Sequence, residues 1–479
     1  MKKMVCLAVV TALMIISISF AMSKPNKSNI NTEVSQNKTI TETLTTFTST
    51  VSTNVLHTET CKTAVVSTEH DVGVESNWRY RGFVADCNDV VLMYNEGNLR
   101  KITDGYQTCL GNVLDSYNSS LALDSVFEAT LRENNPTAIR SDDGHLMGKS
   151  LILTINAALQ ADIYSYMEQN NIIGSVTILD ANGMVRTLVS YPSYDANSDF
   201  TELNLQPHAC LNRCIEPARP GSIFKMLSSV VASEYGFVEY DDPGYLPSLD
   251  ISNWDCNKSP YDNSIHRTLR QAFRFSSNCY YAELFYSLGA DKVTSSLDKH
   301  FSYSSSIECD FITLNNQISV STNSDLARAG FGQRNNISPL YIAMAANAII
   351  TGQMNTPYVA QKTVDTVTWK DIDMLGETKT LSTLPSNLTD EVKLGMLDVA
   401  SDLKLTVRDE IQIFCKTGTA EVSDDGSTND IHYIVATCTD ADSSVDSTKT
   451  VVFQYVNSPN KYASGDAPYV QAILDLIYS

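Results

Sequence analysis

Three short motifs in a fixed order constrain this chain more than any other feature of its sequence. They are Ser222-Ile223-Phe224-Lys225, Ser276-Ser277-Asn278 and Lys416-Thr417-Gly418-Thr419. Each pattern alone recurs by chance in a protein of 479 residues. Together, and each in a fitting local context, they indicate one chemistry: attack on a carbonyl by a serine that a lysine activates.

The first motif is predicted to open a helix. Pro220-Gly221 ends a loop, and apolar residues then recur at helical spacing. Ser222 would lie at the helix N-terminus, where free backbone N–H groups and the helix dipole favour negative charge. Lys225 lies one turn further on the same face, and in a partly dry cleft near other cations it can lose its proton and serve as the base. Taken alone, the motif would be interpreted as an ordinary helix start with a surface lysine, and the context of the other motifs overturns that interpretation.

The second motif is predicted to form a turn between two helices, because amphipathic segments precede and follow it. Ser276 would relay a proton between the lysine and the leaving amine. Asn278 would hydrogen-bond the amide groups of a substrate. In isolation, the same residues are a simple helix-capping pair.

The third motif is predicted to lie on a strand, because Ile411 and Ile413 alternate on the way into it and a second apolar run follows at 431–437. Gly418 would leave space for a substrate backbone beside the strand edge. Lys416 and the hydroxyl groups of Thr417 and Thr419 suit a terminal carboxylate. The backbone N–H groups of Thr419 and Ser222 would complete an oxyanion hole.

The order of the expected elements predicts an α+β fold, with an antiparallel sheet flanked by helices and a small N-terminal accessory domain. A strand is expected over 151–155, a helix over 157–168 and a hairpin from 175–179 and 185–189. Helices are then expected to about residue 350, and strands again after 410. The two ends of this region would therefore close one sheet. The predicted domains are a 1–23 anchor or signal peptide, a 24–59 linker rich in Ser and Thr, a 60–148 accessory domain and a 149–479 catalytic domain.

The N-terminal segment predicts export from the cytoplasm. Lys2 and Lys3 precede an uncharged stretch of 19 residues, 4–22, which as a helix spans about 28 Å and matches a bilayer. This length and the charge placement favour a single membrane anchor with the rest of the chain outside. A signal peptide cleaved near Ala21 and Ser23 is the alternative.

Charge and cysteine content exclude several classes of function. The chain has 34 Lys+Arg against 55 Asp+Glu, a net charge of −21, which argues against nucleic acid as a partner. His208, Cys210 and Cys214 lack a second close pair of ligands for zinc. We therefore expect no metal and no cofactor. Cys279 and Cys415 adjoin the second and third motifs, and we expect both to be packed in the core.

These motifs resemble those of the penicillin-binding protein and serine β-lactamase superfamily, and most closely its monofunctional, class B-like D,D-transpeptidases. Further similar segments are Leu153-Thr154-Ile155-Asn156, Ser190-Tyr191-Pro192-Ser193-Tyr194-Asp195-Ala196-Asn197, Asn212-Arg213, Gly330-Phe331-Gly332-Gln333 and, in a weaker form, Arg81-Gly82-Phe83-Val84-Ala85-Asp86. The resemblance implies that Ser222 attacks the D-Ala-D-Ala end of a peptidoglycan stem peptide, and that an amine of a second stem peptide resolves the acyl-enzyme. β-Lactams would acylate Ser222 as substrate mimics, and other proteins of cell-wall synthesis would be partners.

Three other functions remain open at this point. A D,D-carboxypeptidase would use the same residues, with water in place of the amine. A β-lactamase would need a glutamate that activates the deacylating water, and here Glu308 and Leu314-Asn315 have the wrong spacing for that motif. A non-catalytic module that binds β-lactams or muropeptides is the third alternative, and the intact motifs argue against it.

Overall fold

The computed structural model describes most of the chain beyond residue 78. The described residues are 65–66, 79–97, 99–115, 121–141, 144–198, 206–241, 266–408, 410–421, 430–440 and 443–478. The chain divides into two compact units, Met1–Glu59 and Thr60–Ser479, and the described residues all belong to the second. The predicted anchor and linker lie outside them. No helix in this described part is long and apolar enough to cross a membrane.

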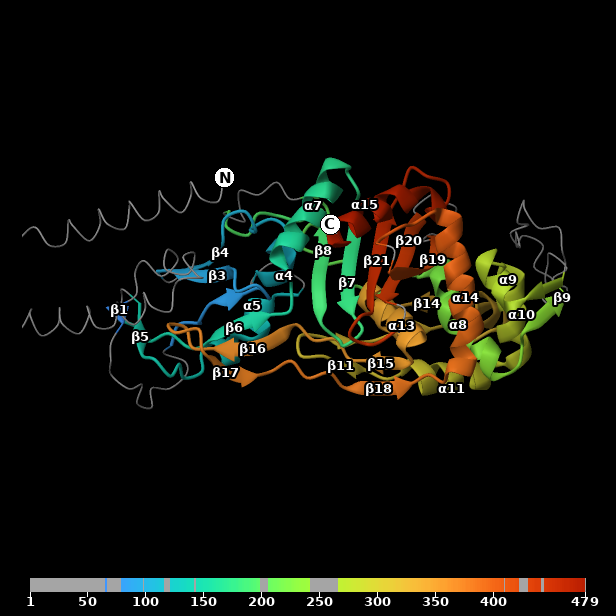
Figure 1. Cartoon of the computed structure of the whole chain (residues 1–479), viewed down its shortest axis with the longest axis horizontal. Helices are drawn as coiled ribbons and strands as arrows, with labels where there is room; N and C mark the ends of the chain where they lie inside the picture. Colours follow the sequence, from blue (N-terminus) through green and yellow to red (C-terminus); the bar gives the residue numbers. More distant parts are fainter. Residues whose placement is uncertain are drawn as a thin grey trace, which may run out of the picture. The chain divides into compact units, whose positions relative to one another are not determined.

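A five-stranded antiparallel sheet joins the beginning and the end of the predicted catalytic region (Figure 1). Its order is β19-β20-β21-β7-β8, with β7 at Gly174–Asp180, β8 at Val185–Tyr191, β19 at Ile411–Glu421, β20 at Asp430–Asp440 and β21 at Lys449–Val456. The contact between the two ends is the antiparallel pair β21 and β7, in which Val451 lies opposite Ile178. The predicted hairpin and the predicted closure of the sheet by both ends are confirmed. β19, which carries the third motif, is an edge strand.

The helices around this sheet come mainly from the middle of the chain. They are α7 (Ala157–Gln169), α8 (Lys225–Glu234), α9 (Leu269–Arg274), α10 (Asn278–Leu288), α11 (Ala290–Phe301), α12 (Asn323–Ala329), α13 (Pro339–Thr351), α14 (Ser386–Leu403) and α15 (Ala467–Tyr478). Two short 3-10 helices, η3 (Gly221–Phe224) and η5 (Ala463–Asp466), precede α8 and α15. The predicted α+β fold, an antiparallel sheet flanked by helices, is confirmed.

Helices cover both faces of the five-stranded sheet. On one face, Asn347 of α13 lies 2.8 Å from the hydroxyl group of Thr450 in β21. On the other face, Tyr469 of α15 stacks on Phe453 of β21, with ring centroids 6.4 Å apart. Thr450 and Phe453 are three positions apart in one strand, so their side chains point to opposite faces. The sheet is thus the middle layer of three.

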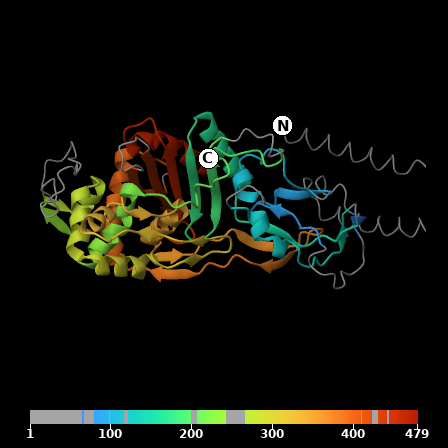
Figure 2. The same ribbon diagram turned by 180° about the vertical axis from the view of Figure 1, so that it is seen from behind.

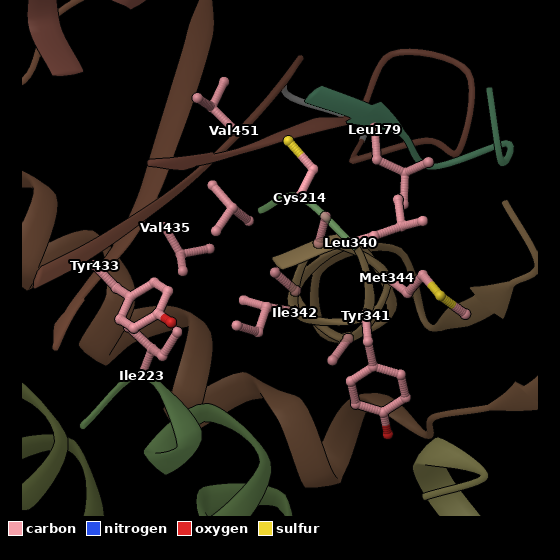
Figure 3. Close-up of a cluster of buried hydrophobic side chains, with 14 of the residues drawn as sticks. Leu179, Cys214, Ile223, Leu340, Tyr341, Ile342, Met344, Tyr433, Val435 and Val451 are labelled. Carbon is pink, nitrogen blue, oxygen red and sulfur yellow. The ribbon is translucent and has the colours of Figure 1, made fainter. Parts of the chain in front are cut away.

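Helix α13 forms the centre of the hydrophobic core (Figure 3). Every residue from Pro339 to Ile350 is buried, which is typical of a helix enclosed on all sides. Figure 3 shows Leu340, Ile342 and Met344 of this helix among side chains from the sheet and from η3. Ile223, next to the predicted nucleophile, is one of those side chains. The reactive turn is therefore anchored directly in the core.

A second sheet of six strands crosses the expected boundary between residues 148 and 149. Its order is β17-β16-β6-β2-β3-β4, with β2 at Val84–Ala85, β3 at Val91–Glu96, β4 at Leu99–Ile102, β6 at Ser150–Leu153, β16 at Ala360–Val364 and β17 at Asp371–Met374. Three strands from after residue 148 (β17, β16 and β6) and three from before it (β2, β3 and β4) meet at the parallel pair of β6 and β2, so the accessory region and the catalytic region share this sheet. Figure 2 shows the orange strands next to teal segments, with the blue strands beyond them.

The strands between residues 353 and 383 correct the expectation that strands return only after residue 410. This region contains β15 (Gln353–Asn355), β16, β17 and β18 (Thr380–Thr383). Several of these strands are short, polar and largely exposed. Such segments lack the apolar alternation that marks a strand in a sequence.

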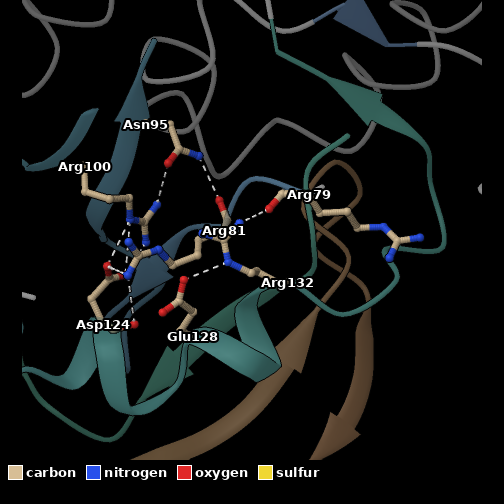
Figure 4. Close-up of polar contacts among 7 residues, drawn as sticks. All are labelled: Arg79, Arg81, Asn95, Arg100, Asp124, Glu128 and Arg132. Atoms are coloured by element: carbon tan, nitrogen blue, oxygen red, sulfur yellow. Dashed lines mark hydrogen bonds and ion pairs between the residues drawn. The ribbon is translucent and has the colours of Figure 1, made fainter. Parts of the chain in front are cut away.

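A buried ion-pair cluster organises the first part of the described chain (Figure 4). Asp124, whose side chain is fully buried, lies 2.6 Å from Arg81 and 2.5 Å from Arg100. Two single-turn helices, α5 (Leu123–Val126) and α6 (Glu128–Leu131), lie in the same region, and Asp124 belongs to the first of them. One further one-turn helix and five pairs of short strands complete the described elements: α4 (Gly111–Leu114), β1 (Val65–Val66) with β5 (Ile139–Arg140), β9 (Glu239–Asp241) with β10 (His266–Thr268), β11 (Ile307–Glu308) with β12 (Thr313–Leu314), β13 (Gln317–Ile318) with β14 (Asn335–Asn336), and β15 with β18.

Candidate active site

The first motif lies on a tight turn that leads into a buried helix. Ser222 belongs to η3, and Lys225 is the first residue of α8. The sequence predicted Ser222 at the start of an α-helix, and the structure instead places it on a 3-10 turn immediately before one. Ile223 and Phe224 are fully buried, so they hold the turn in the core while Ser222 remains partly exposed.

Lys225 is the hub of the site. Its Nζ lies 3.0 Å from Ser222 Oγ, 3.0 Å from Ser276 Oγ and 2.6 Å from Asn278 Oδ1. It also contacts the backbone oxygen of Ser276 at 2.7 Å. Lys225 therefore connects the first motif to the second within hydrogen-bond distance, as the predicted base must.

Ser276 reaches Lys225 because the turn between α9 and α10 is unusually tight. Its φ angle is 56°, in the left-handed region that residues with a side chain seldom adopt. The cap of α10 is provided by Ser277, whose Oγ accepts from the amide of Tyr280 at 3.2 Å. The capping alternative thus applies to Ser277, and Ser276 and Asn278 are directed to Lys225 instead.

Lys416 completes the cluster from β19. Its Nζ lies 3.2 Å from Ser276 Oγ and 2.8 Å from the backbone oxygen of Thr417. The residue is only 1 % exposed. Ser276 Oγ is therefore shared by the two lysines, while Thr417 and Thr419 follow on the same edge strand with their side chains partly exposed.

Gly418 lies directly against the turn that carries Ser222. A Cβ atom at this position would lie 2.8 Å from the backbone nitrogen of Ile223, closer than real contacts allow. A Cβ at Gly221 would likewise lie 2.5 Å from the backbone oxygen of Thr419. These glycines allow β19 to pack directly against η3, which brings the third motif next to the nucleophile. The predicted place of a substrate backbone beside Gly418 stays a prediction.

The two lysines share a dry environment that disfavours two positive charges. Burial, and then the charge of Lys416, hold the pKa of Lys225 well below its usual value. Burial lowers the pKa of Lys416 to about 8. A neutral Lys225 beside a protonated Lys416 is the arrangement that these directions favour. It provides a base next to Ser222 and a cation next to Ser276.

Aromatic rings around the lysines were not anticipated from the sequence. Lys225 Nζ lies 5.6 Å from the ring centroid of Tyr281 and 6.0 Å from that of Phe331. Lys416 Nζ lies 5.5 Å from the ring centroid of Phe273. The only available signal was their sequence position: Phe331 lies between two glycines, and Phe273 and Tyr281 lie three residues before Ser276 and three after Asn278.

The two cysteines beside the motifs behave differently. Cys415 is buried and free, as expected from packing. Cys279 is buried too, but it is disulfide-bonded, which the sequence did not predict. The other cysteines of the described residues are free.

Comparison with known proteins identifies the family. The model of the penicillin binding protein transpeptidase domain matches residues 174–475, more than half of the chain. The chain belongs to the penicillin-binding protein transpeptidase family. The predicted resemblance is therefore confirmed, and the three motifs of this penicillin-binding protein all lie within the matched residues.

Solved structures show that this penicillin-binding protein has the fold of the family. PBPA from Mycobacterium tuberculosis is 21 % identical, covers 84 % of this chain and 100 % of its own, and superimposes with a TM-score of 0.69. The D,D-transpeptidase domain of a peptidoglycan glycosyltransferase from Eggerthella lenta is 19 % identical, with 84 % and 98 % coverage and a TM-score of 0.67. PBP2 from Pseudomonas aeruginosa is 20 % identical, with 83 % and 96 % coverage and a TM-score of 0.65. No curated protein sequence matches the chain.

Proposed function

We propose that this penicillin-binding protein is a peptidoglycan D,D-transpeptidase that works through a Ser222 acyl-enzyme. One observation carries the assignment: Lys225 Nζ lies 3.0 Å from both Ser222 Oγ and Ser276 Oγ. A lysine with a depressed pKa at this distance from a serine is suited to act as its general base.

The geometry supports a balanced first half-reaction. Lys225 takes the proton of Ser222 as Oγ bonds to the penultimate carbonyl carbon of a D-Ala-D-Ala peptide. The proton then passes through Ser276 Oγ to the nitrogen of the terminal D-Ala, and the C–N bond breaks. The Ser222 ester remains and D-Ala leaves as an amine.

The second half-reaction reverses the proton path. An amine of a second stem peptide attacks the ester carbonyl, and its proton returns to Ser222 Oγ as the ester bond breaks. Lys416 and the hydroxyl groups of Thr417 and Thr419 would hold the carboxylate of the donor peptide, and Asn278 its amide groups. The backbone N–H groups of Ser222 and Thr419 would stabilise the oxyanion.

β-Lactams are proposed to acylate Ser222 as mimics of the donor. PBPA from M. tuberculosis has been solved as acyl-enzyme complexes with ceftriaxone, imipenem and penicillin G. Glu308, the glutamate that the sequence suggested for a deacylation motif, is exposed and accepts a hydrogen bond from Thr313 at 2.7 Å. We therefore favour a stable acyl-enzyme over rapid β-lactam hydrolysis.

The test combines labelling with product analysis. A fluorescent penicillin should label the full-length protein, and Ser222→Ala should abolish this label. Ser228→Ala, at another serine of the same helical segment, should retain it. Equal labelling of Ser222→Ala would refute the assignment. With a stem-peptide donor and an acceptor amine, mass spectrometry should find cross-linked dimers. Trimmed monomers alone would instead show a D,D-carboxypeptidase.

We also propose that the catalytic region acts outside the cytoplasm, anchored by residues 4–22. The support is the sequence pattern of two lysines before an uncharged stretch. Cell fractionation should find the whole chain in the membrane fraction, and externally added protease should degrade it in spheroplasts. A soluble, protease-resistant chain would contradict the proposal. Stem peptides and other wall-synthesis proteins would be its partners there.

A further inference from the structure

Lys416 is a buried cation with few polar partners. An ammonium group carries three N–H donors, and Nζ has two oxygen partners, on Ser276 and Thr417. The ring of Phe273, 5.5 Å away at its centroid, faces the same atom. Within the described chain, no carboxylate lies at ion-pair distance from this ammonium group. The ring is thus the remaining favourable contact for the charge.

Helix α14 determines where that ring lies. Phe273 is fully buried on α9, and a Cβ atom at Gly395 of α14 would lie 2.8 Å from its Cδ1 and 3.2 Å from its Cγ. A side chain at Gly395 would therefore push the ring out of place. No other residue type lets α14 approach so closely.

Two ion pairs attach α9 to α14 on the outer side of this contact. Arg270 binds both carboxylate oxygens of Asp398 at 2.7 Å. Arg274, one turn later, binds those of Asp402 at 2.9 and 2.7 Å. These exposed pairs add little stability individually, but they align the two helices in one register. The ring, Gly395 and the ion pairs together form a support beneath Lys416.

We propose that Phe273 is a positioning residue for Lys416: its ring face holds the ammonium group against Ser276, and Gly395 keeps the ring in place. The inference rests on the proposed function, in which Lys416 binds the donor carboxylate and keeps Lys225 neutral. A ring face attracts a desolvated cation, so it favours the protonated form of Lys416. That proton in turn disfavours a second one on Lys225.

The charged and titratable neighbours of Lys416 are few, which makes the effect measurable. Lys225 on α8 is the neighbouring cation, and its pKa is held low partly by Lys416. Among the residues that the structure describes, Cys415 on β19 is the other titratable neighbour, and burial raises the pKa of its thiol to about 12. The rate of acylation is expected to fall at alkaline pH when Lys416 loses its proton, since burial lowers its pKa to about 8. We call this fall the alkaline limb of the pH–rate profile.

The experiment measures the rate of acylation of the whole chain by a fluorescent penicillin from pH 5 to 10. In Phe273→Leu, the alkaline limb should move to lower pH by about one unit and the maximal rate should fall about tenfold, because the cation loses its ring contact. In Gly395→Ala, which retains every atom of Phe273, the limb should move in the same direction. Phe453→Leu removes an equally buried ring from β21 and should leave the limb in place.

The outcomes separate this inference from the proposed function. Labelling that persists in Ser222→Ala would overturn the function itself. Labelling that depends on Ser222, with an unmoved alkaline limb in Phe273→Leu, would overturn only the role of Phe273. If Phe273→Leu does not fold, an unmoved limb in Gly395→Ala decides against the inference. A shift in Phe453→Leu equal to that in Phe273→Leu would also overturn it, since it would show a general effect of core packing.

Discussion

The amide of Gly221 donates a hydrogen bond to the carbonyl oxygen of Gly332 at 3.1 Å, so the residue before the nucleophile is held by the loop after α12. The contact is as close as two backbones can come: a Cβ atom at Gly332 would lie 2.0 Å from the carbonyl oxygen of Gly221. Gly332 also has a φ angle of 83°. The position of Ser222 thus depends on a residue more than a hundred positions later.

Gly332→Ala should therefore damage both stability and catalysis. The methyl group would force the two backbones apart and strain the positive φ, at a cost of about 3 kcal/mol or more in the free energy of unfolding. Acylation should slow at least about tenfold in the protein that remains folded, because Ser222 moves. Urea unfolding and penicillin labelling measure the two effects.

Gly236→Ala is the matched control for this change. Gly236 also has a positive φ angle, 69°, but a Cβ atom there would meet nothing within 4 Å. The free energy of unfolding of Gly236→Ala should fall only by the cost of the backbone strain, about 1–2 kcal/mol. Its rate of labelling by penicillin should stay unchanged. If both variants behaved alike, the backbone contact would not be what positions Ser222.

Lys225→Ala should slow acylation by at least about a hundredfold, the usual effect of losing a general base. The variant should still fold, because it no longer has to bury an amine at a cost in desolvation free energy. Lys225→Arg should be as slow, because guanidinium stays protonated at working pH. Stopped-flow acylation gives the rates, with Lys461→Ala, an exposed lysine, as the control. A rate near that of the native chain in either Lys225 variant would leave this residue a purely structural role.

The rate of acylation should depend on pH with two limbs of opposite sign. Lys225 must be neutral, so the rate rises as pH passes the lowered pKa of this amine. Lys416 must be protonated, so the rate falls as pH passes about 8. Acylation of Lys416→Gln, measured over the same pH range, should be slow but lose the alkaline limb. If that limb persisted in Lys416→Gln, another group would cause it.

The residues of the site could be predicted from the sequence, but the packing contacts that hold them in place could not. The spacing of Ser222 and Lys225 is local, so a helical turn alone places one beside the other, and the structure agrees. The contact of Lys416 with Ser276 joins residues 140 positions apart, and only the resemblance of the motifs suggested it. The packing of Phe273 on Gly395 joins two helices whose individual patterns carry no sign of each other.

For the fold too, elements with a strong local sequence pattern could be predicted, and elements that depend on distant partners could not. Strong apolar alternation predicted the hairpin of β7 and β8 and the strand β19, and the structure contains all three. The strands β16 and β17 are short and partly polar. β16 pairs with β6 from about two hundred residues earlier, and β17 in turn pairs with β16. No local pattern reveals such pairing, because its stability comes from the partner strand.

The buried cluster of Asp124, Arg81 and Arg100 should be a main determinant of stability in the first part of the described chain. The side chain of Asp124 is fully buried, and those of Arg81 and Arg100 are only 10 % and 7 % exposed. Asp124→Ala removes a carboxylate that two desolvated guanidinium groups share, so the free energy of unfolding should fall by about 3–5 kcal/mol. Asp371→Ala, which breaks an exposed pair with Lys362, should cost less than about 1 kcal/mol. Urea unfolding of both variants makes the comparison, and similar losses would show that burial of the cluster does not govern its contribution.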